Sequence, residues 1–146
     1  MNGGLPAARV AGLVTPHRRR AVEAAVQLAR ASLELRLLRS KRSDRLLGSW
    51  HADAQDEQVS VAQLSEAQCV GYAVFWAGRL LPWHPTCLPQ AIAVKRMLRR
   101  RGITSRLELG ITKPPVGEAH AWVTVQGQPV IGQGELERFA VLGGFE

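Results

Sequence analysis

Two residues of this 146-residue chain have the type and the placement that nucleophilic catalysis needs. Cys87 follows Pro85 and Thr86, which predict the start of a helix, and the free first-turn N–H groups and the helix dipole favour an anion there. A thiolate at this point can attack a carbonyl, and the same N–H groups can stabilise the resulting oxyanion. His120 begins a strand-like run, where an imidazole can serve as base and then as acid. Together they predict thioester chemistry.

Each residue also has a purely structural interpretation. An unpaired cysteine is commonly a small core residue, and Cys69 is expected to be one, on the buried side of a helix. Only two cysteines occur, which excludes a disulfide framework and a four-cysteine zinc site and favours a reducing, cytoplasmic setting. The chain shows no phosphate-binding loop, so we expect neither a metal nor a cofactor.

The elements that must position these residues point to an α+β fold made of N-terminal helices followed by an antiparallel sheet. Residues 1–17, rich in glycine and proline, are expected to form a flexible arm ahead of a single domain over residues 18–146. Within the domain, residues 18–81 are predicted to be mainly helical, 86–102 to form the helix that carries Cys87, and 105–142 to form antiparallel strands.

The helical part divides at a polar stretch over residues 40–58, expected to be a loop with a short helical turn near Leu46 and Leu47. Ser60, with a glutamine three residues on, predicts the cap of a second helix that runs to about Leu81. The apolar stripes expected to be buried are Val22, Val26, Ala29, Leu33 and Leu37 on the first helix, where Leu28, Leu35 and Leu38 widen the apolar face, and Ala62, Cys69, Ala73, Trp76 and Leu80 on the second.

After Gly102 the apolar period changes to two, which is typical of half-buried strands. The predicted strands cover 106–111, 120–125, the run that starts at Pro129, and 139–142, and we expect them to form a meander. On the second strand, His120 and Trp122 share one face and Ala121 and Val123 the other.

Charge favours an acidic partner, since the formal net charge is +7 and the pI is about 10.7. The arginines, however, are spread over amphipathic helices, which is typical of a solvated face. We therefore expect no nucleic acid as partner, and keep a basic nucleic-acid-binding protein only as an alternative. No run of 18 apolar residues occurs, so no membrane association is expected.

Two blocks carry a resemblance to a known family. PWHPTCLPQAIAVKRMLRRRGI, residues 82–103, and AHAWVTVQGQPVIG, residues 119–132, resemble the transglutaminase-like domain of lasso-peptide biosynthesis proteins. The resemblance extends from about residue 18 to the end. It implies a transglutaminase-like, papain-like cysteine protease fold and a leader peptidase, which cuts the leader from a ribosomally made precursor. It further implies that Cys87 is the nucleophile and His120 the base.

The third catalytic position departs from the family pattern. Many relatives carry an aspartate on the next strand, but here Gly132 follows the Pro-Val-Ile run and no aspartate lies beyond Asp56. Glu135 is the predicted replacement, because a glutamate can orient an imidazole as an aspartate does. Gln133, Glu137 and a backbone orienter remain alternatives.

The resemblance also implies partners. The chain has no room for a leader-recognition domain before Arg18, so we expect the separate peptidase half of a split protein. Its partners would be the lasso precursor with its leader, a separate leader-recognition protein and the ATP-dependent lasso cyclase. A non-catalytic scaffold that joins these partners is the alternative that the missing aspartate leaves open.

Overall fold

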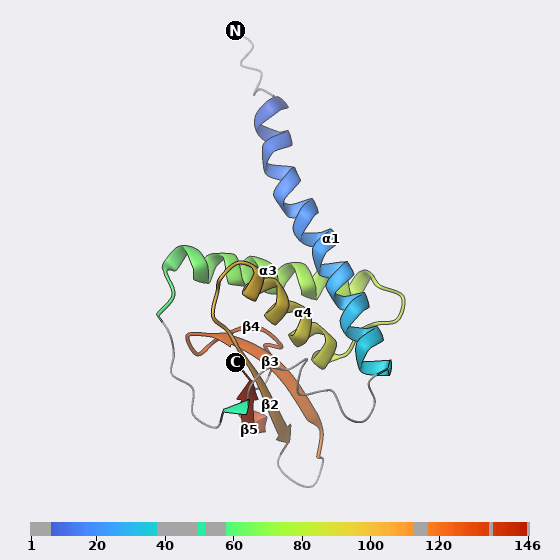
Figure 1. The fold of residues 1–146 in the computed structure, drawn as a ribbon, viewed down its shortest axis with the longest axis vertical. Helices are drawn as coiled ribbons and strands as arrows, with labels where there is room; N and C mark the ends of the chain where they lie inside the picture. Colours follow the sequence, from blue (N-terminus) through green and yellow to red (C-terminus); the bar gives the residue numbers. More distant parts are fainter. Residues whose placement is uncertain (1–6, 38–49, 52–57, 113–116, 135, 146) are drawn as a thin grey trace.

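The computed structural model describes residues 7–37, 50–51, 58–112, 117–134 and 136–145 (Figure 1). Its helices are α1 (Ala7–Leu37), α3 (Val61–Leu80) and α4 (Cys87–Arg100), with a 3-10 turn η1 (Leu136–Arg138). Its strands are β1 (Trp50–His51), β2 (Arg106–Thr112), β3 (Ala119–Val125), β4 (Gln128–Ile131) and β5 (Phe139–Phe145). The helices form one layer and the antiparallel sheet another, so the predicted α+β class is confirmed.

Helix α1 begins earlier than the sequence predicted. It starts at Ala7 and contains Pro16, so residues 7–17 are helical, where the sequence predicted an arm ahead of the first helix, while residues 1–6 lie outside the described part. A proline inside a helix removes one backbone hydrogen bond, but the residues before Pro16 include good helix formers, and the helix continues through it.

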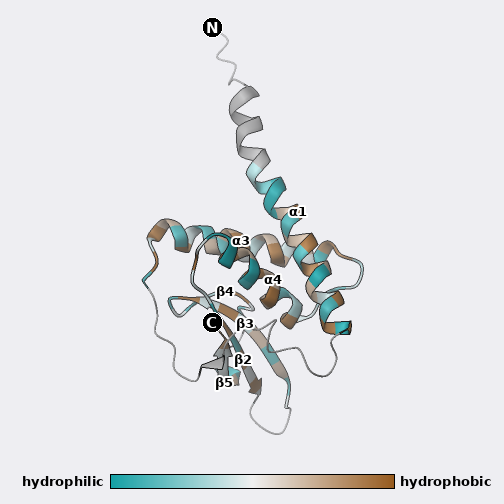
Figure 2. Ribbon diagram, viewed as in Figure 1, coloured by the Kyte–Doolittle hydropathy of each residue, from teal (hydrophilic) through white to brown (hydrophobic). Residues whose placement is uncertain are grey.

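The buried face of α1 is only in part the predicted one. Leu28 is fully buried and Leu35 packs against the core, as expected, together with Ala24 and Ala31. The predicted central stripe is largely exposed, with exposed fractions of 64% for Val22, 57% for Val26, 56% for Leu33 and 73% for Leu37. In this orientation Glu23 and Glu34 form ion pairs with Arg101 and Arg96. Figure 2 shows hydrophobic residues on α1 and α3 as well as on the strands.

Helix α3 has the predicted limits but another buried side. Ser60 forms a capping box with Gln63, as expected. The predicted stripe is wrong: Cys69 is exposed, as are Trp76 and Leu80. The buried residues are Ala67, Val70, Gly71, Val74, Ala77 and Gly78. Small residues occupy much of this face because α3 approaches β4 closely. A Cβ at Gly71 would lie 1.8 Å from the carbonyl oxygen of Val130.

An ion-pair cluster joins the three helices. The guanidinium of Arg101, just after α4, donates to Glu23 of α1 at 2.7 Å and to Glu66 of α3 at 3.1 Å, and Arg20 donates to Glu66 at 2.6 Å. The hydrogen bond from Arg101 is the main reason why the pKa of Glu23 is lowered. Burial alone would raise the pKa of Glu66, but the hydrogen bonds from Arg20 and Arg101 lower it overall.

We expect Arg101→Met to lower the free energy of unfolding by about 1–2 kcal/mol at pH 7, because it leaves two partly buried carboxylates short of a partner. A carboxyl with a lowered folded pKa stabilises the protein above its unfolded pKa, and this contribution disappears as the pH falls through the folded value. The difference in Tm between wild type and Arg101→Met should therefore shrink below about pH 4.5, the ordinary value for Glu23 and Glu66.

Thermal unfolding between pH 7 and pH 3 measures this difference, with the exposed Arg99→Met as the matched control. A difference in Tm that stays constant over the whole range would mean that Arg101 acts through packing rather than charge.

The sheet order is β1-β5-β2-β3-β4, and every neighbouring pair is antiparallel. The predicted meander is wrong in one respect, because β5 returns across the sheet to pair with β2 instead of β4. Strand β1, which pairs with β5 through Trp50 and His51, was not predicted, and the expected turn at Leu46 and Leu47 lies outside the described residues.

The core lies between the helices and the sheet. Helix α4 is central, since it packs against α1 and α3 on one side and β3 on the other. It buries Ile92, Val94, Met97 and Leu98 there, while β3 buries Val123 and Val125. Both residues predicted to do chemistry therefore sit at ends of elements that the core fixes. No helix within the described ranges is long and apolar enough to cross a membrane.

Candidate active site

Cys87 is the first residue of α4, as predicted. The N-cap residue Thr86 makes no side-chain cap hydrogen bond. An N-cap hydroxyl normally accepts from the second or third N–H of the helix, and the third position here is Pro89, which has none. The N–H groups of Cys87 and Leu88 are thus left at the head of the helix, where they can stabilise a developing oxyanion.

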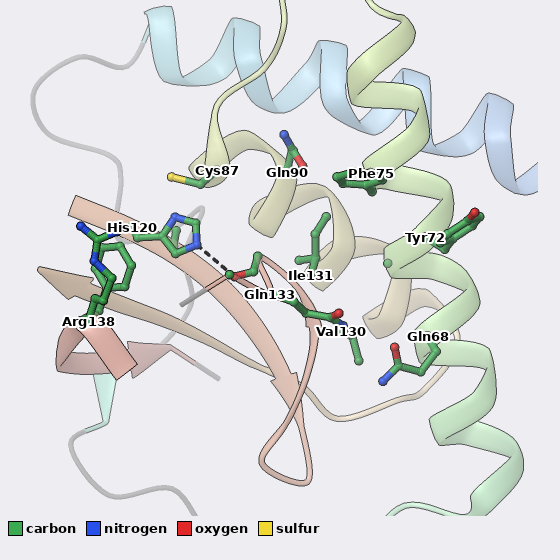
Figure 3. A pocket seen from close by; sticks show the side chains of 15 residues that line it. Gln68, Tyr72, Phe75, Cys87, Gln90, His120, Val130, Ile131, Gln133 and Arg138 are labelled. Atoms are coloured by element: carbon green, nitrogen blue, oxygen red, sulfur yellow. Dashed lines mark hydrogen bonds between the residues drawn. The ribbon is translucent and has the colours of Figure 1, made fainter. Parts of the chain in front are cut away.

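The structure brings Cys87 and His120 to one cavity of about 740 Å³. Figure 3 shows the Cys87 side chain at the head of α4 and the imidazole of His120 at the start of β3. Helix α3 forms the opposite wall through Gln68, Gly71, Tyr72 and Phe75, and the segment from Val130 to Gly134 forms the floor. A cavity of this size can hold several residues of a peptide.

The tautomer of His120 follows from its hydrogen bond. Its Nε2 lies 3.1 Å from the carbonyl oxygen of Gly132, shown as the dashed line in Figure 3. A carbonyl oxygen can only accept, so Nε2 carries a proton, and in a neutral ring Nδ1 then keeps its lone pair. In Figure 3 this second ring nitrogen faces the side of the cavity where Cys87 lies. The neutral imidazole therefore presents a base toward the thiol.

Gly132 allows this hydrogen bond because it has no side chain. Its φ of +79° lies in the left-handed region that favours glycine. A Cβ at this position would approach the Cβ of Trp122 to 2.7 Å and the carbonyl oxygen of Ala121 to 3.0 Å. The backbone carbonyl thus supplies the hydrogen-bond acceptor at the position where the family pattern predicts an aspartate.

The predicted third residues have different outcomes. Glu135 lies outside the described residues, so its role stays a prediction. Gln133 lines the cavity, but its amide donates to the carbonyl of Pro129 at 2.7 Å. Glu137 is exposed in η1 and is not among the described residues that line the cavity. The backbone orienter, through Gly132, is the alternative that the geometry supports.

Aromatic rings hold the imidazole of His120 in place. Trp122 stacks with it at 5.9 Å between ring centroids, and Phe139 of β5 packs at 5.0 Å. Gly110 of β2 makes room for this arrangement, because a Cβ there would lie 2.7 Å from the Trp122 ring. Trp122 is thus a buried support of His120 and not an exposed wall of the cavity.

Other lining residues were not found from the sequence. Gln90 lies one turn after Cys87, and its side-chain amide donates to the carbonyl of Pro85 at 2.8 Å, which ties the preceding loop to the helix. The helical spacing from Cys87 was the signal that could have indicated Gln90. Arg138 is the one permanently charged side chain among the described lining residues. Within the described part of the chain, no three His, Cys, Asp or Glu residues gather in a way that could hold a metal ion.

Comparison with known proteins agrees with this geometry. A family model described as the transglutaminase-like superfamily matches residues 29–143. The matched range includes α3, α4, β1 to β4, β5 as far as Gly143, and both Cys87 and His120. No curated protein and no solved structure matches the chain.

Proposed function

The chain belongs to the transglutaminase-like superfamily, and on that premise we propose that it is a cysteine peptidase that removes the leader from a lasso-peptide precursor. It acts with a separate leader-recognition protein, before the ATP-dependent cyclase closes the ring. The reaction takes place in the cytoplasm, where reducing conditions keep Cys87 as a free thiol.

The reaction follows from the placement of the two side chains. His120 Nδ1 takes the proton of the Cys87 thiol, and the sulfur attacks the carbonyl carbon of the last leader residue. The first-turn N–H groups of α4 bind the oxyanion. The intermediate collapses to a thioester as the peptide C–N bond breaks and His120 gives its proton to the departing amine of the core peptide. Water, deprotonated by His120, then attacks the thioester and releases the leader acid and the thiol.

One observation carries this proposal. Cys87 and His120 come from different elements and line one cavity. The hydrogen bond from His120 to Gly132 leaves the lone pair of Nδ1 available to accept the thiol proton. The test is mass spectrometry of a synthetic cognate lasso precursor after incubation with the protein, with and without the recognition protein. A single cut between leader and core supports the proposal. An intact precursor in the presence of the correct recognition protein would overturn it.

Because Nε2 of His120 already has a neutral acceptor, we expect Glu135→Gln to keep kcat/KM for leader cleavage within about threefold of wild type. Initial rates of cleavage measure this, with the exposed Glu137→Gln as the matched control. A loss of about 100-fold for Glu135→Gln alone would show that a carboxylate orients the base.

A binding role without turnover is the second candidate, favoured by the uncharged partner of His120. A carbonyl stabilises an imidazolium less than a carboxylate does, which would slow the steps that require His120 to carry charge. This scaffold would bind precursor equally well with Cys87 or alanine at position 87 and would cut neither. Detectable cleavage by the wild type excludes it.

A further inference from the structure

We propose that the groove between α1 and α3 is a second binding site for the substrate polypeptide, and that it holds an extended apolar segment remote from the bond that is cut. The inference rests on the proposed function, because it assigns this site to the peptide that Cys87 and His120 would cleave.

The groove is a neighbour of the candidate active-site cavity. It has a volume of about 600 Å³ and includes Ala21 and Ala25 of α1 and Cys69 and Trp76 of α3. Gln68 and Tyr72 line both spaces, so the two are separated only by these side chains of α3. A peptide that crosses α3 over Tyr72 would reach both.

The walls of the groove carry large apolar side chains that the described residues leave exposed. Tyr72 is 66% exposed, Trp76 46% and Leu80 82%. The rings of Tyr72 and Trp76 are in edge contact at 5.9 Å between centroids, which fixes their positions. Clustered exposed apolar residues are unusual on a folded surface and mark places where another chain binds, and aromatic side chains dominate the energy of such contacts.

Length and charge define the occupant. Gln68 and Leu80 are twelve positions apart on α3, or about 18 Å at the helical rise, which about five residues of extended chain would cover. No acidic residue lines the groove within the described part of the chain, and its ionisable lining residues are His17, Arg20, Cys69 and Tyr72. Arg20 is already paired with Glu66, at 2.6 Å. The guanidinium of Arg79, 6.0 Å from the centre of the Trp76 ring, supplies a cation beside the groove. An apolar segment flanked by an acidic residue fits both features.

Cys69 supplies the reporter for the test. It is exposed and lines the groove, and in Cys87→Ala it is the only cysteine of the chain. This variant cannot form the thioester, so the precursor stays intact on it. Alkylation of Cys69 by N-ethylmaleimide is followed by mass spectrometry with the recognition protein alone, with the full-length cognate precursor added, and with a precursor fragment that keeps four residues on each side of the cut.

We expect the full-length precursor to slow alkylation of Cys69 by at least tenfold and the short fragment to slow it less than twofold. Precursors truncated from one end or the other then show which side of the cut occupies the groove. In the protein that retains Cys87, Leu80→Ser should lower kcat/KM for the full-length precursor by about tenfold and leave cleavage of the fragment unchanged. Val61→Ser, at the other end of α3 and 86% exposed, is the matched control that should alter neither.

Two results overturn the inference. In the first, the wild type cleaves the precursor, but a saturating amount of the same precursor does not change the rate of Cys69 alkylation. The peptidase proposal would then stand, and the groove would hold no substrate. Protection of Cys69 by the recognition protein alone would make the groove a protein interface instead. Protection by a precursor that the wild type fails to cut would support the groove and overturn the peptidase, so the two proposals fail separately.

Discussion

Replacing Cys87 with alanine should abolish leader cleavage, with a loss of at least about 10³-fold in the initial rate. Alanine has no nucleophile, so no thioester can form, and the free N–H groups at the head of α4 have no attached oxyanion to stabilise. His120→Ala should lower the rate by about 10²- to 10⁴-fold, the range that general acid–base groups contribute. Mass spectrometry of the precursor, sampled over time, measures both losses.

The chain contains its own control for the cysteine. Cys69→Ala removes the other thiol, which lies in the α1–α3 groove and not among the residues of the active-site cavity. Cleavage of the short precursor fragment, which does not reach the groove, should therefore stay within about twofold of wild type. Equal losses for Cys69→Ala and Cys87→Ala would contradict the assignment of Cys87 as nucleophile. So would a Cys87→Ala protein that still makes the single cut.

Gly132→Asp should impair the enzyme instead of improving it, although it places a carboxylate where the family pattern predicts one. The added Cβ would lie 2.7 Å from the Cβ of Trp122, and a backbone φ of +79° strains any residue with a side chain. We expect a loss of about 2–4 kcal/mol in the free energy of unfolding from strain and overpacking together. The carbonyl should also move away from His120, lowering kcat/KM by at least about 100-fold.

Chemical denaturation and initial cleavage rates at saturating recognition protein measure the two effects of Gly132→Asp. Gly134→Ala is the matched control, since Gly134 lines the same cavity and a Cβ there meets nothing within 4 Å. It should keep both stability and activity close to wild type. A Gly132→Asp protein that is as stable as wild type and more active would show that the loop accepts a side chain and that the base prefers a carboxylate.

The fold was predictable wherever local chemistry decides it. Ser60 begins α3 through a capping box, and the strand-like runs predicted β3, which carries His120, and β4, which ends just before Gly132. The orientation of α1 was only partly predictable from periodicity, because apolar residues lie around most of the helix and its contacts with α3 and α4, among them the pair of Glu23 with Arg101, join residues far apart in the sequence. The position of β5 beside β2 likewise depends on long-range pairing.

The same division holds for the candidate site. Cys87 and His120 could be predicted because their side chains are distinctive and their neighbours indicate a helix head and a strand. The acceptor at Gly132 could not, because every residue has a backbone carbonyl and only the fold decides which one meets an imidazole. The only sign in the sequence was the glycine itself, and its left-handed conformation became visible only in the structure.

On the proposed function, the close approach of α3 to β4 at Gly71 limits which substrates can be cut. The missing side chain lets the two backbones pack closely, so the wall that carries Tyr72 and the floor that leads to Gly132 form one packed unit. We expect such a cleft not to widen enough to admit a folded domain. The peptidase would then cut only chains that are unfolded over the length of the cleft, and a precursor would become resistant to cutting as soon as the segment around the bond folds.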